Sequence, residues 1–205
     1  MLPEPSPVTH LRNVFAQSPM GKNLLLLLQQ QQRQNNNNNN IHRSSSSYSS
    51  IITKPKPEAI EAYDLEVVKA IRNSDIAKLR ELHGKGKSLD ACNRFGESLI
   101  HMACRRSDLP LVTFLVEECK VNVSVRDDFG RCILHDACWT TVPNFGVMDV
   151  LIRNVSPEML LAPDVRGHTP FHYARKEHWN QWVQFLTERQ DVMLRRLALV
   201  VQVVG

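Results

Sequence analysis

The chain has 205 residues, 42% of them hydrophobic, and a formal net charge of +4, so it can bury an ordinary globular core. No apolar run approaches the about 20 residues that a membrane-spanning helix needs. The opening MLPEPSPVTH has prolines and an acid where a secretory signal has a basic start and an apolar core. We therefore expect neither a membrane protein nor an exported one.

The excess of basic charge lies at the N-terminal end. Residues 1–57 hold six Lys or Arg and one acid, whereas the rest of the chain holds 19 bases and 20 acids. A nucleic-acid-binding domain is expected to show a concentrated basic face. We therefore expect no nucleic-acid partner, and weak binding by the basic tail is the alternative.

Residues 1–57 are of low complexity, with the tracts QQQQRQNNNNNN, SSSSYSS and KPKP. Such polar tracts cannot bury enough apolar surface to offset their chain entropy. Leu24–Leu28 is the one apolar patch, and an isolated helix there is marginal in water. We predict a disordered Gln/Asn/Ser-rich tail over residues 1–57.

Three specific roles for this tail are open beside the plain one of a spacer. Its few acids and its Ser and Arg residues also fit an organelle transit peptide. Gln/Asn runs can self-associate, and Ser6-Pro7 and Ser18-Pro19 are minimal phosphorylation motifs. The spacer is the favoured interpretation.

Two short amphipathic helices are predicted after residue 58. Their apolar residues recur at spacings of three and four, Asn73-Ser74-Asp75 separates the helices, and Gly84 and Gly86 end the second one. The apolar positions are Leu65, Val68, Ile71, Ile76, Leu79 and Leu82.

Further along, three segments repeat one pattern. GESLIHMACR, GRCILHDACW and GHTPFHYARK begin at Gly96, Gly130 and Gly167, spaced by 34 and 37 residues. His101, His135 and His172 recur at the same two spacings. A period of this length is typical of a stack of similar supersecondary units.

The repeated residues resemble the ankyrin repeat, whose pattern is D-x-x-G-x-T-P-L-H-x-A. GHTPFHYA matches it almost letter for letter, and Asp127 and Asp164 occupy the leading Asp position. The resemblance implies an all-α-dominated repeat solenoid of helix-turn-helix units with short β-turn or hairpin connections. It divides residues 58–190 into units of approximately 60–93, 94–126, 127–163 and 164–190, the first of them a capping unit. The apolar residues 191–205 are either a closing helix or an exposed tail.

The residue chemistry agrees with this register. Glycine at the start of each repeated segment permits a positive φ in a turn. Ser98 and Thr169 can cap the first helices, and Pro170 suits a first helical position. The small residues Ala103, Ala137 and Ala174 stand where paired helices approach closely.

The most reactive-looking segment is GRCILHDACW, with Cys132, His135, Asp136 and Cys138. The repeat gives these residues structural roles rather than reactive ones. Cys132 stands at the helix cap, Cys138 at a packing position, and His135 where a histidine bonds to the backbone. One histidine per layer is too far from the next to share a metal. We expect no catalytic residue, metal or cofactor. A thiol or redox function of Cys132 and Cys138 is the alternative, and it requires an exposed thiol of lowered pKa.

The chain has five cysteines, an odd number, and we see no export signal in its sequence. We therefore expect reduced thiols and a cytoplasmic or nuclear protein. Import into an organelle is the alternative.

The resemblance implies a non-catalytic scaffold or adaptor, a monomer that binds an unidentified protein through hairpin tips and the surface of the first helices. Aromatic residues and arginines, which are enriched at interface hot spots, occur at those positions. For the aromatic ones, packing within the chain is the competing interpretation, and it is favoured for Trp179 and Trp182. The expected partner-binding residues are Arg94, Phe95, Arg105, Arg106, Asp128, Phe129, Arg131, Trp139, Arg166, His168 and Lys176.

Overall fold

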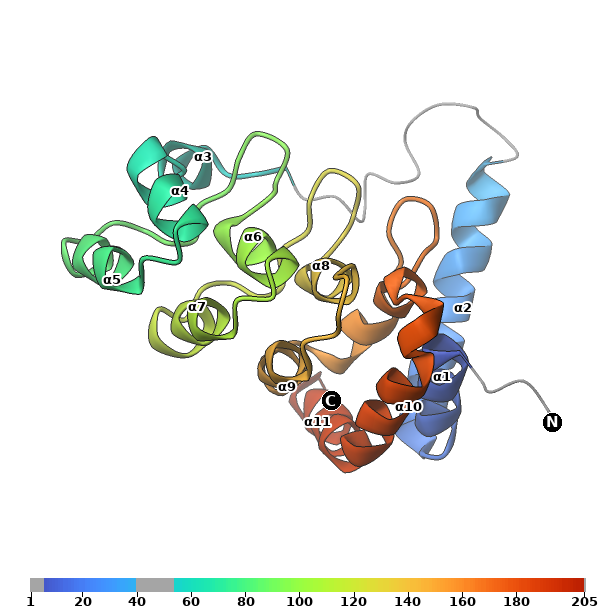
Figure 1. The fold of residues 1–205 in the computed structure, drawn as a ribbon. Coiled ribbons are helices and arrows are strands. Elements are labelled where there is room, and N and C mark those ends of the chain that lie inside the picture. The colour runs from blue at the N-terminus through green and yellow to red at the C-terminus, as the bar shows by residue number, and fades with distance from the viewer. Residues whose placement is uncertain (1–5, 40–53, 205) are drawn as a thin grey trace.

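The structure, a computed structural model, describes residues 6–39 and 54–204 (Figure 1). Its α-helices, in chain order, are α1 Pro7–Ala16, α2 Pro19–Asn39, α3 Pro57–Glu61, α4 Leu65–Arg72, α5 Ile76–Gly84, α6 Leu99–Arg105, α7 Leu109–Thr113, α8 Ile133–Cys138, α9 Phe145–Asn154, α10 Trp179–Glu188 and α11 Gln190–Val204. The π-helical turn η1 Phe114–Glu118 extends α7, and the 3-10 helices are η2 Pro157–Leu161, η3 Pro170–Tyr173 and η4 Lys176–His178.

Helix pairs stack side by side along the molecule. α4/α5, α6/α7, α8/α9 and finally η3/α10 follow one another, and the loops before α6, α8 and η3 project from one edge (Figure 1). α6 packs on α8, α8 on η3, and α7 on α9. The predicted all-α-dominated repeat solenoid is therefore confirmed. The described residues contain no strand, only the isolated bridges Cys92–Ser98 and Arg126–Cys132 at the base of two hairpins.

Each projecting hairpin is held by an Asn or Asp side chain at its start. Oδ1 of Asp127 accepts hydrogen bonds from the backbone N–H groups of Phe129 (3.0 Å) and Arg131 (2.8 Å). Asp164 and Asn93 do the same in the neighbouring hairpins. The glycine at each tip has a φ of 71° to 80°, which side chains with a Cβ rarely adopt.

Aliphatic side chains make up most of the core, and small and aromatic ones occupy particular positions in it. Ala103, Ala137 and Ala174 are buried, as the repeat register predicts. In the last unit Trp182 is fully buried, and its ring centroid lies 5.0 Å from that of Phe145 and 5.5 Å from that of Phe171. Trp182 is therefore a packing residue, as expected.

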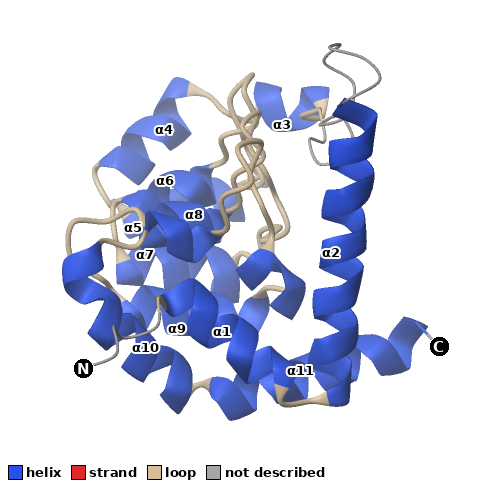
Figure 2. Ribbon diagram, turned by 90° about the vertical axis from the view of Figure 1, so that its right-hand side faces the viewer, coloured by secondary structure: helices blue, strands red, loops and turns tan. Residues whose placement is uncertain are grey.

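The N-terminal region differs from the predicted disordered tail over residues 6–39. α1 packs on η3 and α10 of the last unit, and α2 packs on α1 and α11 (Figure 2). Leu11 and Phe15 of α1 are fully buried. Polar tracts bury little apolar surface by themselves, whereas this tail buries its apolar residues against the end of the stack. Residues 1–5 and 40–53 of the predicted tail lie outside the described residues.

Both serine-proline pairs of this region begin helices. The backbone N–H of Thr9 donates to Oγ of Ser6 (3.2 Å), and that of Gly21 donates to Oγ of Ser18 (2.9 Å). Proline suits the position that follows such a cap. A Cβ atom on Gly21 would lie 1.9 Å from the carbonyl oxygen of Phe15, so the turn between α1 and α2 admits glycine alone.

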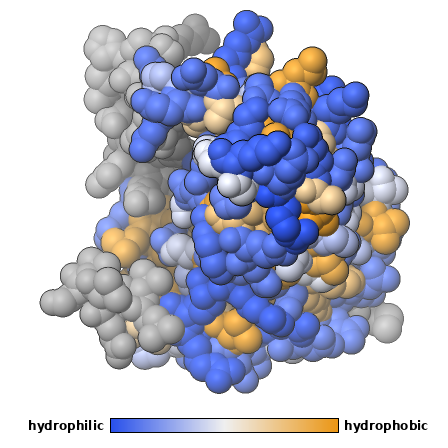
Figure 3. All heavy atoms as spheres, turned by 90° about the vertical axis from the view of Figure 1, so that its left-hand side faces the viewer, coloured by the Kyte–Doolittle hydropathy of each residue, from blue (hydrophilic) through white to orange (hydrophobic). Residues whose placement is uncertain are grey.

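The C-terminal residues form a closing helix rather than a separate tail. α11 contacts α2, α9, α10 and η2, with Met193 and Leu197 buried. One end of the stack is thus covered by α1, α2 and α11. The opposite end, formed by α3, α4 and α5, is mainly hydrophilic with scattered hydrophobic residues (Figure 3), as a capping unit requires. None of the described helices combines the length and apolarity that a membrane crossing demands.

Candidate functional site

The Cys/His segment forms one hydrogen-bonded unit. Nδ1 of His135 lies 3.1 Å from the backbone nitrogen and 3.2 Å from Sγ of Cys132, and Nε2 lies 3.0 Å from the carbonyl oxygen of His168. Because a backbone N–H only donates, Nδ1 must be unprotonated, and Nε2 therefore carries the proton and donates it. The ring links the start of α8 to the next hairpin.

The same arrangement recurs in the other repeats. Nδ1 of His101 lies 2.7 Å from Oγ of Ser98, and Nε2 lies 3.2 Å from the carbonyl oxygen of Arg131. In the last unit Nδ1 of His172 lies 2.9 Å from Oγ1 of Thr169. Burial lowers the pKa of His135 to about 4 and also lowers that of His101, which keeps both rings neutral.

The thiols of this segment do not have the properties of reactive ones. Cys132 and Cys138 are buried, and burial raises the pKa of Cys132 to about 11 and that of Cys138 well above its usual value. A reactive cysteine needs the opposite, an accessible thiol of lowered pKa. In the described part of the chain, no three His, Cys, Asp or Glu side chains gather as metal ligands. The segment is a structural link between repeats.

Asp136, the remaining polar residue of the segment, is a fully buried carboxylate. Its Oδ1 lies 3.1 Å from Nε of Arg105 in the preceding repeat, and its Oδ2 lies 3.3 Å from Nη2. The same guanidinium lies 2.6 Å from Glu97. Burial raises the pKa of Asp136, and Arg105 is its hydrogen-bonded countercharge.

Three of the expected contact residues are exposed aromatic side chains. The exposed fraction is 48% for Phe95, 50% for Phe129 and 52% for Trp139. Backbone hydrogen bonds hold the hairpin tips next to one another, from the N–H of Asp128 to the carbonyl of Phe95 (2.8 Å) and from the N–H of Val165 to the carbonyl of Phe129 (2.9 Å). The rings therefore stand on a fixed edge of the stack.

Arg131 joins two of these rings. Its guanidinium carbon lies 5.0 Å from the ring centroid of Phe129 and 5.8 Å from that of Trp139, and Asp127 holds its Nη2 at 2.6 Å. Trp139 continues to Tyr173 of the next unit, with ring centroids 5.9 Å apart. Phe129, Arg131, Trp139 and Tyr173 form what we call the aromatic–arginine cluster.

His168 extends this cluster, with its ring centroid 6.1 Å from that of Tyr173. Tyr173 is not among the residues expected from the sequence, because the repeat register places it at the variable position after the histidine. An aromatic residue at that position, where the other units have Met102 and Asp136, was the available signal.

The remaining expected residues lie around the cluster without joining it. Arg94 stacks over Phe95, with its guanidinium carbon 4.7 Å from the ring centroid. Asp128, Arg106, Arg166 and Lys176 are exposed, and Nζ of Lys176 lies 5.9 Å from the ring centroid of Trp179. Trp179 is half-buried, and its Nε1 donates to the carbonyl of Ala174 (3.2 Å).

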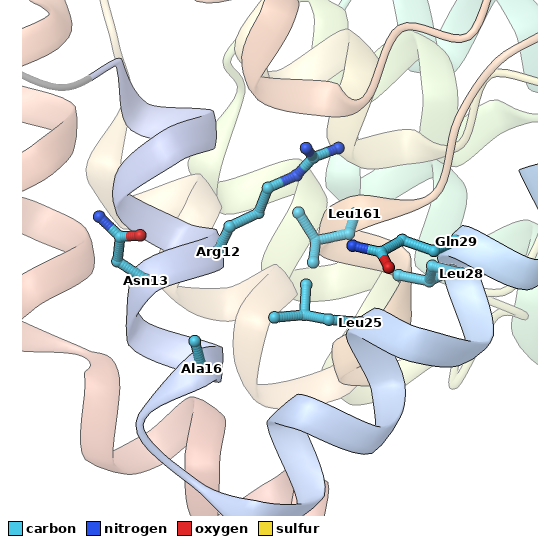
Figure 4. A pocket seen from close by; sticks show the side chains of 7 residues that line it. All are labelled: Arg12, Asn13, Ala16, Leu25, Leu28, Gln29 and Leu161. Atoms are coloured by element: carbon cyan, nitrogen blue, oxygen red, sulfur yellow. The ribbon is translucent and has the colours of Figure 1, made fainter.

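A pocket of about 260 Å³ lies between α1, α2 and η2 (Figure 4). Leu25, Leu28 and Leu161 line it, together with the polar side chains of Arg12 and Gln29. Its lining contains no carboxylate, imidazole or thiol, and thus no general acid–base pair or nucleophile. The pocket does not support a catalytic assignment.

Comparison with known proteins agrees with this geometry. Residues 67–158 match the family described as ankyrin repeats, in three copies. The chain is also similar to a probable serine/threonine-protein kinase of Dictyostelium discoideum, with 32% identity over 69 residues. That match covers 33% of the chain and 7% of the kinase, so the chain corresponds to a small part of that protein.

Proposed function

We propose that this chain, in which residues 67–158 are ankyrin repeats, binds another protein through its hairpin tips and the exposed ends of its first helices. Ankyrin repeats are generally interaction modules rather than enzymes. The described part of the chain offers a rigid stack, and its buried Cys/His segment serves that rigidity.

The observation that carries the proposal is the aromatic–arginine cluster. Two large rings, about half exposed, are held by a guanidinium that a buried aspartate fixes in place. Rings that are already immobilised lose little conformational entropy on binding, and Trp, Tyr and Arg dominate the binding energy of protein interfaces. The cluster belongs to two neighbouring repeats, so one partner would contact both.

An affinity purification with the immobilised full chain tests this function. The test variant is Phe129→Ala/Trp139→Ala. The matched control is Leu26→Ala/Leu27→Ala on α2, where the two side chains are 55% and 57% exposed. We expect the wild type and the control to retain the same partner protein and the test variant to lose it. Equal recovery by all three chains would refute the proposed surface.

A further inference from the structure

The surface around the aromatic–arginine cluster carries cations for which the described part of the chain supplies no carboxylate partner. Within residues 6–39 and 54–204, no acidic side chain lies in ion-pair distance of five exposed bases at the hairpin tips and first-helix ends. These are Arg72, Arg94, Arg106, Arg166 and Lys176. The part of the chain after residue 57 is close to neutral as a whole, so this excess is local.

The acids of the same surface are already engaged. Glu97 and Asp136 are paired with Arg105, and Asp127 is paired with Arg131. Asp128 is the exposed acid there for which no ion pair is found among the described residues. The free cations therefore outnumber the free acids, and the surface presents a positive potential to an approaching molecule.

The guanidinium of Arg94 is also prearranged. It lies 4.7 Å from the ring centroid of Phe95, which restricts the side chain, and Arg94 is exposed to solvent. A planar guanidinium held in this way matches a carboxylate in a two-point contact. The exposed rings of Phe129 and Trp139, beside Arg131, match an apolar side chain.

We propose, on the basis of the proposed function, that the partner contributes an acidic segment with at least one apolar side chain. Its carboxylates contact Arg94, Arg106 and Arg166, and its apolar side chain packs on Phe129 and Trp139. A protein segment fits better than a nucleic acid, because the exposed carboxylate of Asp128, at the tip of one of these hairpins, repels phosphates.

The probe is a phage-displayed library of short random peptides, selected on the immobilised full chain. Two test variants are used, Arg94→Ala/Arg106→Ala for charge and Phe129→Ala/Trp139→Ala for the rings. The control is Lys22→Ala/Arg33→Ala, two exposed bases on α2. We expect selected peptides rich in Asp and Glu that also contain an apolar residue. In fluorescence anisotropy the charge variant should bind them about tenfold more weakly, with the control unchanged and wild-type affinity falling as salt rises.

The outcomes separate the two proposals. Selected peptides that depend on Phe129 and Trp139 but contain no excess of acids would overturn the acidic segment and leave the proposed function in place. If no selected peptide bound either test variant more weakly than the wild type, both proposals would be overturned. Tight binding of a labelled oligouridylate, lost in the charge variant, would assign the surface to nucleic acid and overturn the acidic segment.

Discussion

Nε2 of His135 donates a hydrogen bond to the carbonyl oxygen of His168, 33 residues later, over 3.0 Å. The same ring accepts the backbone N–H of Cys132 at Nδ1. Only the neutral imidazole does both, because protonation turns Nδ1 into a donor that faces another donor. The contact between these two repeats therefore depends on the protonation state of one side chain.

The free energy of unfolding is expected to decrease as the pH is lowered below 6.5. The pKa of His135 is about 4 in the folded chain and 6.5 as the ordinary value, so the unfolded chain takes up the proton first. The stabilisation is complete above pH 6.5 and is lost as the pH falls toward 4, at about 1.4 kcal/mol per pH unit and about 3 kcal/mol in total. Denaturant unfolding at a series of pH values measures this slope.

A His135→Gln variant is the control for the pH experiment. Glutamine retains a donor and an acceptor but does not titrate, so the variant should be less stable at pH 7 and lose less stability on acidification. His101, whose pKa burial also lowers, leaves a residual slope. Identical slopes for the two chains would show that His135 does not carry the effect.

Replacing Arg105 by Met should destabilise the chain by about 3 kcal/mol at neutral pH, because it leaves the buried carboxylate of Asp136 without its partner. Burial raises the pKa of Asp136. Relative to wild type at the same pH, the loss should therefore shrink as the pH is lowered, because protonation removes the unpaired buried charge. Arg106→Met, at an adjacent exposed arginine, should cost less than about 0.5 kcal/mol. A loss that does not change with pH would argue against an unpaired charge.

Replacing Phe15 by Ala should lower the free energy of unfolding by about 3–5 kcal/mol, because the ring is fully buried where α1 meets the last unit. Asn13→Ala, at an exposed position of the same helix, should change it by less than about 0.5 kcal/mol. Urea unfolding followed by circular dichroism compares the three chains. Equal midpoints for Phe15→Ala and wild type would mean that α1 contributes nothing to the folded stack.

The unbound Phe129→Ala/Trp139→Ala variant should keep most of its stability. Both rings are about half exposed, so their removal should cost about 1 kcal/mol rather than the several that a buried aromatic residue costs. Differential scanning calorimetry without a partner measures this. A large loss of melting temperature would mean that these rings serve internal packing.

The native thiols should react slowly with an alkylating reagent. Cys104, Cys132 and Cys138 are buried, and burial raises the pKa of each. Even the partly accessible Cys119 has its pKa raised to about 11 by burial, so little thiolate is present at neutral pH. Mass spectrometry after a short exposure, compared with the unfolded chain, follows each site. Fast labelling of Cys132 or Cys138 in the native state would revive a thiol function.

Much of the repeat architecture follows from short stretches of sequence. The positions of Gly96, Gly130 and Gly167, and of the histidines five residues later, predict the hairpins and histidine–backbone hydrogen bonds, and the structure has both. The structure adds that His101 and His135 also bond to the next hairpin. These interactions join residues at most about one repeat apart, which is why a repeated pattern reveals them. Asn93, which replaces the leading Asp of the pattern, makes the same turn contacts.

The N-terminal helices were not predicted, although local signals were present. Ser6-Pro7 and Ser18-Pro19 are helix starts, and Val8, Leu11 and Phe15 recur at spacings of three and four. The composition of the surrounding tract outweighed them. A short amphipathic helix is marginal in isolation, and its stability comes from the surface on which it packs.

The sequence alone therefore determined the repeat period, the hairpins, the backbone-bonding histidines and the structural role of Cys132 and Cys138, because contacts within a repeat or between neighbours decide them. Tertiary structure alone decided that α1 covers the last unit and that Arg131 stands between Phe129 and Trp139. Oγ1 of Thr187 forms a hydrogen bond with Nε2 of His10, although the two residues are 177 positions apart in the sequence. Such contacts form only when the complete stack presents the surface whose burial offsets the entropy of ordering the chain between them.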